Sequence, residues 1–348
     1  MFLNIAEDKT GYGYHLELDK IKGSFRYSVS RNVWSNTLDI NDLGYLQRNN
    51  VVENSAQLNY NIYEPFSIFK DWGARTWFEN TRLFEPNAAI ENVMNAVSYA
   101  TFKNNWNASI YTGYNFGTTD YFEPRSSNNR YYLEPGHYVG EIDFNTDTNK
   151  KLSWYLNYGF YNTLEKDRWG DWINTNIWWK ASARFNLFYD FSVRKEYNAK
   201  GFVDSFNDDN IFFGTYDRNT FENTFSMGYT FNTKLAVDFR ARHYWSFADY
   251  EDQQYFLNLD GSLKADNHTS QNDVNFNAFN IDMVVRWEFA PGSELSLAWK
   301  NAIYHENELV NMKFGENLKE TFASDQTNSV SLKILYYIDY NTLVKRKD

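Results

Sequence analysis

The chain contains no cysteine, only five prolines and no long uninterrupted apolar stretch. Without cysteine there are no disulfide bonds, thiol nucleophiles or thiolate metal sites. A helix that crosses a bilayer needs about 20 mostly apolar residues, so transmembrane helices are excluded. Positive charge is also scarce, because 34 Lys and Arg stand against 45 Asp and Glu, giving a net charge of -11. A nucleic-acid groove needs clustered cations, so we expect no nucleic-acid partner.

Aromatic residues, in contrast, are abundant. They make up 20% of the 348 residues, with 12 Trp, 27 Tyr and 29 Phe. Such side chains favour β-strands and form the aromatic girdles of membrane β-barrels. The mean hydropathy of -0.66 does not argue against a barrel. In a barrel wall lipid-facing and lumen-facing residues alternate, so the average looks soluble.

A two-residue alternation between apolar and polar side chains is the strongest local signal. Residues 279–289 (FNIDMVVRWEF) have an apolar residue at every odd position and mostly polar residues between them. This period is that of a β-strand, whose successive side chains point to opposite faces. The same pattern recurs at residues 24–30, 152–161, 173–185 and 235–242. We therefore expect an all-β protein with one apolar and one polar face.

The connections between these runs alternate in length. Short links lie near residues 20–22, 64–66, 103–105, 147–150, 185–186, 232–234 and 290–293, and they are rich in Asn, Gly, Pro and Lys. Longer polar segments lie near residues 33–51, 80–90, 117–137, 163–171, 197–217, 247–273 and 305–326. This rhythm predicts a transmembrane antiparallel up-and-down β-barrel in a bacterial outer membrane, with short periplasmic turns and long extracellular loops.

The predicted barrel occupies residues 1–348 as a single domain of about 16 strands, or 14. From Tyr12 to Tyr340 about 15 strands can be counted, whereas single-chain bacterial barrels have an even number. Residues 2–7 are therefore interpreted as the remnant of a first strand, with Met1 not the start of the full protein. Residues 329–340 are predicted as the final strand, which the outer-membrane assembly machinery would read. Outer-membrane lipid is the other expected partner.

Several segments resemble a known family. They are DINDLGYLQRNN at residues 39–50, GTTDYFEPR at 117–125, NAFNIDMVVRWEFAPGSELSLAWKNAIY at 277–304 and SLKILYYIDY at 331–340. They are similar to the β-barrel domain of uncharacterised outer-membrane proteins of Bacteroidota, in which a family-9-type carbohydrate-binding domain precedes the barrel. The resemblance covers nearly the whole chain. The sugar-binding module is absent from these residues, and the family offers no catalytic residues to transfer.

Two groups of residues are candidates for function. Charged residues on the polar face are predicted to line a lumen and set permeability: Asp238, Arg240, Arg242, Asp282, Arg286, Glu288 and Lys300. Trp34, Trp169 and Trp172 are predicted to lie in loops or on the polar face. Indole rings in such places more often pack within loops or a plug, but they could also stack on an oligosaccharide ligand. We therefore expect a channel or surface scaffold linked to glycan binding or uptake.

Enzymatic chemistry is not favoured. No G-x-S-x-G segment or other nucleophile context is present, and the five histidines are scattered, so neither a catalytic nor a metal site is predicted and no cofactor is expected. The acidic segments at residues 39–42 and 207–210 lack the spacing of a known calcium loop. Asp282, Glu288 and Glu294 could form an acid/base pair. Arg240, Arg242, Arg286 and Lys300 share their face, however, which favours cross-strand ion pairs instead. A barrel-embedded hydrolase and a soluble or surface-exposed β-sheet glycan-binding protein remain the alternatives.

Overall fold

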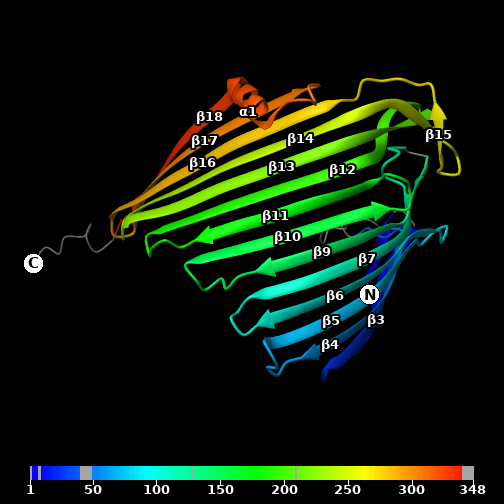
Figure 1. Ribbon diagram of the computed structural model, residues 1–348, viewed down its shortest axis with the longest axis horizontal. Coiled ribbons are helices and arrows are strands. Elements are labelled where there is room, and N and C mark those ends of the chain that lie inside the picture. The colour runs from blue at the N-terminus through cyan, green and yellow to red at the C-terminus, as the bar shows by residue number, and fades with distance from the viewer. Residues whose placement is uncertain (1, 7–8, 40–48, 127, 208–209, 339–348) are drawn as a thin grey trace, which may run out of the picture.

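The computed structural model describes residues 2–6, 9–39, 49–126, 128–207 and 210–338, and it is almost entirely β-sheet (Figure 1). The strands are β1 (Phe2–Ala6), β2 (Lys9–Lys20), β3 (Phe25–Trp34), β4 (Val51–Ile62), β5 (Phe69–Leu83), β6 (Ala89–Phe102), β7 (Asn107–Asp120), β8 (Tyr132–Glu134), β9 (His137–Asn145), β10 (Leu152–Thr163), β11 (Trp169–Trp179), β12 (Phe185–Asn207), β13 (Asn210–Asn232), β14 (Leu235–Leu257), β15 (Leu263–Asp266), β16 (Val274–Ala290), β17 (Ser293–Asn307) and β18 (Gln326–Leu335). One helix in the described part, α1 (Phe314–Ala323), lies between β17 and β18.

These 18 strands form one antiparallel sheet in which nearly every strand pairs with the next in sequence. The short strands β8 and β15 pair only with the far ends of β7 and β14. Beside them, β7 pairs directly with β9, and β14 with β16. The remaining 16 strands make an up-and-down meander, so the prediction of an all-β antiparallel fold is confirmed. Among the described residues, no pairing joins the two edge strands, β1 and β18.

The two ends of the strands differ, as the sequence predicted, but two of the predicted long loops are wrong. Residues 197–217 mostly continue β12 and β13, and residues 247–257 continue β14, so that each of these three strands is 23 residues long. Polar composition suggested loops there, whereas pairing across β12, β13 and β14 extends the ladder through several bulges. The predicted strand at residues 173–185 is also interrupted, because β11 ends at Trp179 and a turn precedes β12.

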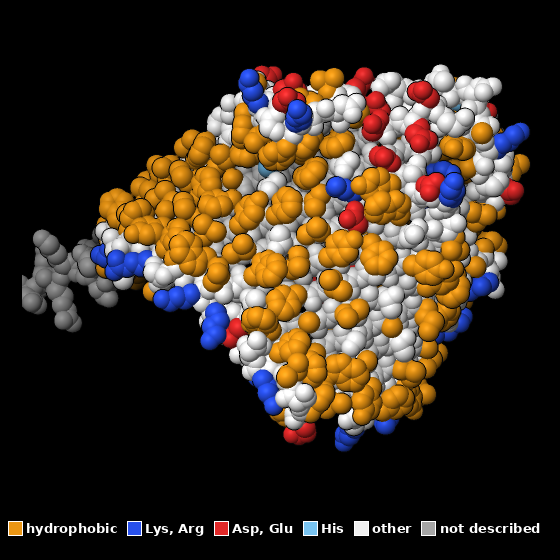
Figure 2. Space-filling model, viewed as in Figure 1, with side chains coloured by type: hydrophobic (Ala, Val, Ile, Leu, Met, Phe, Trp, Pro, Cys, Tyr) orange, Lys and Arg blue, Asp and Glu red, His pale blue; other side chains and the backbone are white. Residues whose placement is uncertain are grey.

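One face of the sheet, here called the apolar face, carries exposed hydrophobic side chains across successive strands. Ile110, Ile142, Tyr158 and Ile173 are paired neighbours on β7, β9, β10 and β11. Their exposed fractions are 64%, 49%, 37% and 36%, so nothing in the described chain covers them. Figure 2 shows hydrophobic side chains spread over the viewed surface, with Lys and Arg along its lower left edge. Soluble proteins rarely leave contiguous apolar surface uncovered across several neighbouring strands.

Toward the long loops the same face becomes polar. Arg31 donates a hydrogen bond to Asn54 (2.8 Å), Asn54 to Asn80 (3.1 Å), and Asn80 to Asn92 (2.7 Å), which forms a ladder across β3, β4, β5 and β6. On its own strand, each of these residues is an even number of positions away from the exposed apolar residues, so its side chain is on the same face. The ladder therefore marks where the apolar band ends on this side of the sheet.

Helix α1 covers another part of the apolar face near the long loops. Asn317 is fully buried and exchanges hydrogen bonds with Asn277 at 2.6 and 2.9 Å. The Phe314 ring lies 5.8 Å from the ring of Trp245, which is only 3% exposed. Trp245 is on the apolar face of β14, and the helix covers it there. No helix in the described chain is long and apolar enough to cross a membrane.

A small hydrophobic core lies at the long-loop end, where the segment around β8 packs against the extended strands. Tyr132 joins Ile211, Phe213 and Leu257 in a buried cluster. Beside it, the Arg168 side chain is 7% exposed and donates hydrogen bonds to Glu134 (2.8 Å) and to the Tyr132 hydroxyl (3.2 Å). Burial raises the pKa of Tyr132 to about 12, although the nearby Arg168 acts in the opposite direction.

Candidate functional site

The seven predicted lumen residues all lie on the opposite face of the sheet, here called the polar face, on β14, β16 and β17. Asp282 is the centre of an ion-pair group: it accepts a hydrogen bond from Arg242 at 2.9 Å and lies 3.5 Å from Arg240 and 3.9 Å from Lys300. Cross-strand pairing produces this group, because Asp282 is the direct partner of Arg240 on β14 and of Lys300 on β17.

The other predicted residues extend the same wall. Arg286 forms an ion pair with Asp238, and this pair is nearer the short turns than Asp282 is. These side chains are about half exposed, and such pairs contribute little stability in water. They place fixed charges in contact with solvent along the polar face of three neighbouring strands.

Glu288 has no ion-pair partner among the described residues, but register places it opposite Glu294. Directly paired residues have Cβ atoms about 4.5–5.5 Å apart. Asp282 lies six residues away on the same strand, about 20 Å at roughly 3.3 Å per residue. The structure therefore separates Asp282 from the predicted carboxylate set and brings only Glu288 and Glu294 together.

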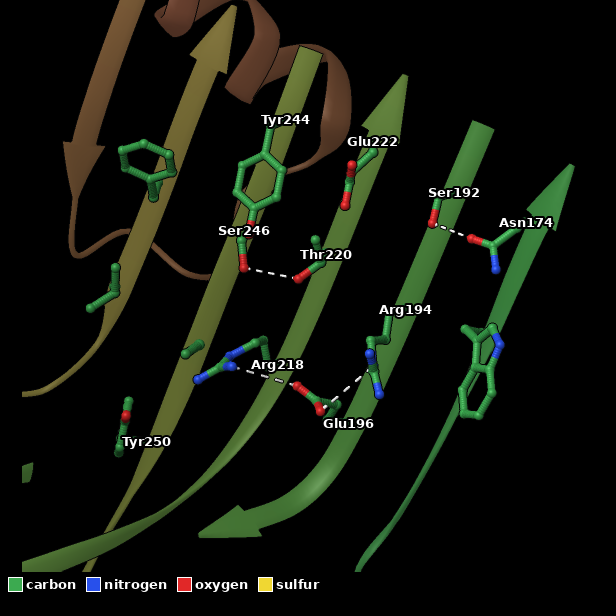
Figure 3. A pocket seen from close by; sticks show the side chains of 14 residues that line it. Asn174, Ser192, Arg194, Glu196, Arg218, Thr220, Glu222, Tyr244, Ser246 and Tyr250 are labelled. Carbon is green, nitrogen blue, oxygen red and sulfur yellow. Dashed lines mark hydrogen bonds and ion pairs between the residues drawn. The ribbon is translucent and has the colours of Figure 1, made fainter. Parts of the chain in front are cut away.

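Farther along the polar face is a hollow of about 740 Å³, formed by β11, β12, β13, β14 and β16 (Figure 3). Its volume is within the range of about 300–1,000 Å³ that small-molecule sites occupy. Glu196 lies between two guanidinium groups, with an oxygen 3.7 Å from Arg194 and another 3.7 Å from Arg218. Thr220 and Ser246 share a hydrogen bond of 2.9 Å on the same floor, and Glu222 lies beyond them.

Trp172 forms one wall of this hollow, and its position is fixed by neighbours on β10. The indole nitrogen donates a hydrogen bond to Asn157 at 3.1 Å, and the ring lies against Gly159. A Cβ at Gly159 would be 2.2 Å from the ring, so only glycine leaves room for it. The Arg194 guanidinium lies 5.4 Å from the ring centroid, a cation–π distance. Tyr244 lies on the far side of the hollow.

The three tryptophans predicted to stack on sugars are not brought together. Trp172 lies in the hollow, whereas Trp169 stacks on Tyr197 with ring centroids 4.3 Å apart. Trp34 is the last residue of β3, opposite Gly13 in register. Of the three, Trp172 is the one that lines the hollow, where its neighbours are mostly polar.

Sequence reasoning missed all four charged residues that line the hollow, which are Arg194, Glu196, Arg218 and Glu222. The alternation of Ser192, Arg194 and Glu196 with Phe191, Val193 and Lys195 was a signal that could have placed the first two on the polar face. The prediction of a loop from residue 197 onward hid the rest, because Arg218 lies beside that loop.

No metal centre emerges in the described ranges, where no group of three or more His, Cys, Asp or Glu side chains could hold an ion. His268 pairs with Asp204 at 3.2 Å and His243 is buried beside Phe314, so the histidines lie apart. Most of the acidic segments at residues 39–42 and 207–210 falls outside the described residues.

A family model described as a domain of unknown function (DUF5916) matches residues 2–347. Because the match spans nearly the whole sequence, the chain belongs to this family. No curated protein matches the chain.

Proposed function

We propose that this family member is an outer-membrane β-barrel whose polar face lines a water-filled channel. The observation that carries the proposal is the exposed apolar face, which continues across paired strands such as β7, β9, β10 and β11. Lipid is the one environment in which so much apolar surface is stable without a protein partner. The polar face then encloses water, as lumen-facing residues of such barrels do.

The height of the apolar band supports this proposal. On β16 the alternation from Phe279 to Phe289 covers eleven residues. At roughly 3.3 Å per residue and a tilt of about 45°, the band is about 25 Å high, which matches a transmembrane β-strand. On β3 to β6, the amide ladder that begins at Arg31 lies at the end of the band that is nearer the long loops.

Aromatic rings and cations follow the short turns. Neighbouring rings contact one another along this end of the sheet, in the pairs Tyr60–Trp72, Trp106–Phe144, Phe144–Trp154, Trp179–Phe185, Phe185–Tyr229 and Phe289–Tyr336. Lys22, Lys103, Lys150, Lys180 and Lys234 lie in the adjoining turns. Aromatic girdles mark the membrane interface, and cations beside them meet lipid phosphates.

Closure of the barrel is part of the proposal. The meander has 16 strands, an even number, so β1 runs toward the long loops and β18 runs away from them. These edges are therefore antiparallel and suited to pair with each other. An exposed edge strand such as β18 is also a surface on which the outer-membrane assembly machinery would act by strand addition.

Glycan binding or uptake is a narrower candidate for the same hollow, and Trp172 favours it. An indole face beside hydrogen-bonding groups such as Asn174 and Ser192 suits a sugar ring. A protein that serves only as a surface scaffold would bind its partners through the long loops. The charged residues around Asp282 on the polar face instead favour a channel through which solutes pass.

The proposal is tested by extraction and permeation. The chain should require detergent, migrate faster on SDS gels before heating than after, and make lipid vesicles permeable to small polar solutes. Monodisperse behaviour in buffer without detergent would instead favour the soluble glycan-binding protein. A hydrolase would be supported by turnover of lipid or oligosaccharide that disappears in Glu288→Gln while the gel shift is kept.

A further inference from the structure

The hollow on the polar face contains cationic groups with unused hydrogen-bonding capacity. Arg194 and Arg218 share the single carboxylate of Glu196, each at 3.7 Å. Direct charge-assisted hydrogen bonds between such groups are about 2.7–2.9 Å long. No hydrogen bond within the described chain uses either guanidinium group, and their side chains are 54% and 40% exposed. Both can therefore donate to an incoming anionic group.

The same hollow contains an anionic group without a partner. Glu222 is exposed on β13 and makes no hydrogen bond or ion pair with the rest of the described structure. Its direct neighbour on β12 is Ser192, and Thr220 pairs with Arg194 in the next position of the same face. Glu222 and Arg194 are thus diagonal neighbours, which in a sheet lie about 7–8 Å apart. A small solute can reach both.

We propose that this hollow binds a small zwitterion, an amino acid or a dipeptide. Its carboxylate accepts hydrogen bonds from Arg194 and Arg218, and its ammonium group donates to Glu222. An apolar side chain of the solute lies against Trp172 of β11 or Tyr244 of β14, which both line the hollow.

Charge balance favours this class of solute over others. Two cations and two anions, Arg194, Arg218, Glu196 and Glu222, leave the hollow neutral overall, so a solute with a net charge gains no general attraction. A neutral sugar has no ionic group for the separated charges to recognise. The inference rests on the proposed function because it names the solute class that would pass along the polar face.

Binding is measured on the full chain in detergent micelles by isothermal titration calorimetry. The probes are alanyl-leucine, its N-acetyl form, its C-terminal amide and maltotriose. Alanyl-leucine should bind at least about tenfold more tightly than either blocked form, since each loses a hydrogen-bonded charge contact. Glu222→Gln should weaken alanyl-leucine about tenfold and leave the N-acetyl form unchanged. Arg194→Met should have the mirror effect, sparing the amide form.

Glu79→Gln is the matched control, because Glu79 is an exposed carboxylate on the polar face of β5, outside the hollow, and it should leave all four affinities unchanged. Equal binding of the blocked and free dipeptides, or tighter binding of maltotriose with no effect of Glu222→Gln, would overturn the inference. The comparison of probes on the unmodified chain does not depend on any variant folding.

Vesicle permeation separates this inference from the proposed channel. Dipeptide binding with the expected charge dependence, but without flux through vesicles, would leave the site standing and refute the channel. Flux that is identical for free and blocked dipeptides, without measurable binding, would refute the site and leave the channel standing.

Discussion

Replacing Val285 with arginine tests whether the apolar face meets lipid. Val285 is in the middle of the β16 band, between Val237 on β14 and Leu297 on β17. An arginine at the membrane midplane of a β-barrel costs about 2–4 kcal/mol. At a partly exposed site in water the same change costs about 0.5 kcal/mol or less, since the long side chain reaches solvent.

The neighbouring residue provides the matched control. Val284 is on the opposite face of the same strand and pairs with Asp238. Val284→Arg therefore places the same charge beside a carboxylate on the polar face, and we expect little loss of stability or a small gain. Both variants are unfolded with urea in lipid vesicles, and the free energies of unfolding are compared.

A difference of about 2 kcal/mol or more, with Val285→Arg the less stable, supports lipid contact. Equal stabilities within about 0.5 kcal/mol would refute the reasoning that assigns the two faces, because an arginine would then find the same environment on both.

Three further changes test the long-loop end. Arg168→Met should lower the free energy of unfolding by about 1–2 kcal/mol in urea titrations, because the partly exposed Glu134 carboxylate and the Tyr132 hydroxyl lose a hydrogen-bond donor; an unchanged midpoint would contradict this. Tyr132→Phe should flatten the alkaline loss of stability: the folded pKa of Tyr132 is about 12 against about 10 unfolded, so its stabilisation is complete below pH 10 and disappears as pH rises through 12. Asn317→Ala should remove two of the hydrogen bonds of the fully buried Asn277 amide at a cost of about 1–3 kcal/mol, seen as faster proteolysis of residues 308–325; an unaltered cleavage rate would show that α1 does not depend on this contact.

The strands were predictable wherever one face of the sheet is apolar and the other polar. Residues 279–289 identified most of β16 because the two-residue period is set by the backbone and needs no knowledge of the partner strand. The period also places Asp282, Arg240 and Lys300 on one face, but it does not say which residues lie opposite one another. That pairing depends on the register between strands, which only the structure supplies.

The long-loop end was harder to predict because its contacts join distant parts of the chain. Ile211 and Phe213 belong to a strand extension that is stabilised by Tyr132, about 80 residues earlier. Nothing local distinguishes such a segment from a polar loop. Helix α1 was missed for the same reason, since Asn317 is satisfied only by amides on β16. The hollow at Arg194 depends on this region and was missed with it.

The three 23-residue strands make the molecule lopsided. At roughly 3.3 Å per residue each is about 75 Å long, of which a 25 Å membrane at a tilt of about 45° takes about 11 residues. In the proposed barrel, about 40 Å of each of these strands would then stand clear of the bilayer, on one side of the channel only. Antibodies, phages and neighbouring surface polymers would meet these strand ends first, and solutes would reach the proposed channel from the opposite side.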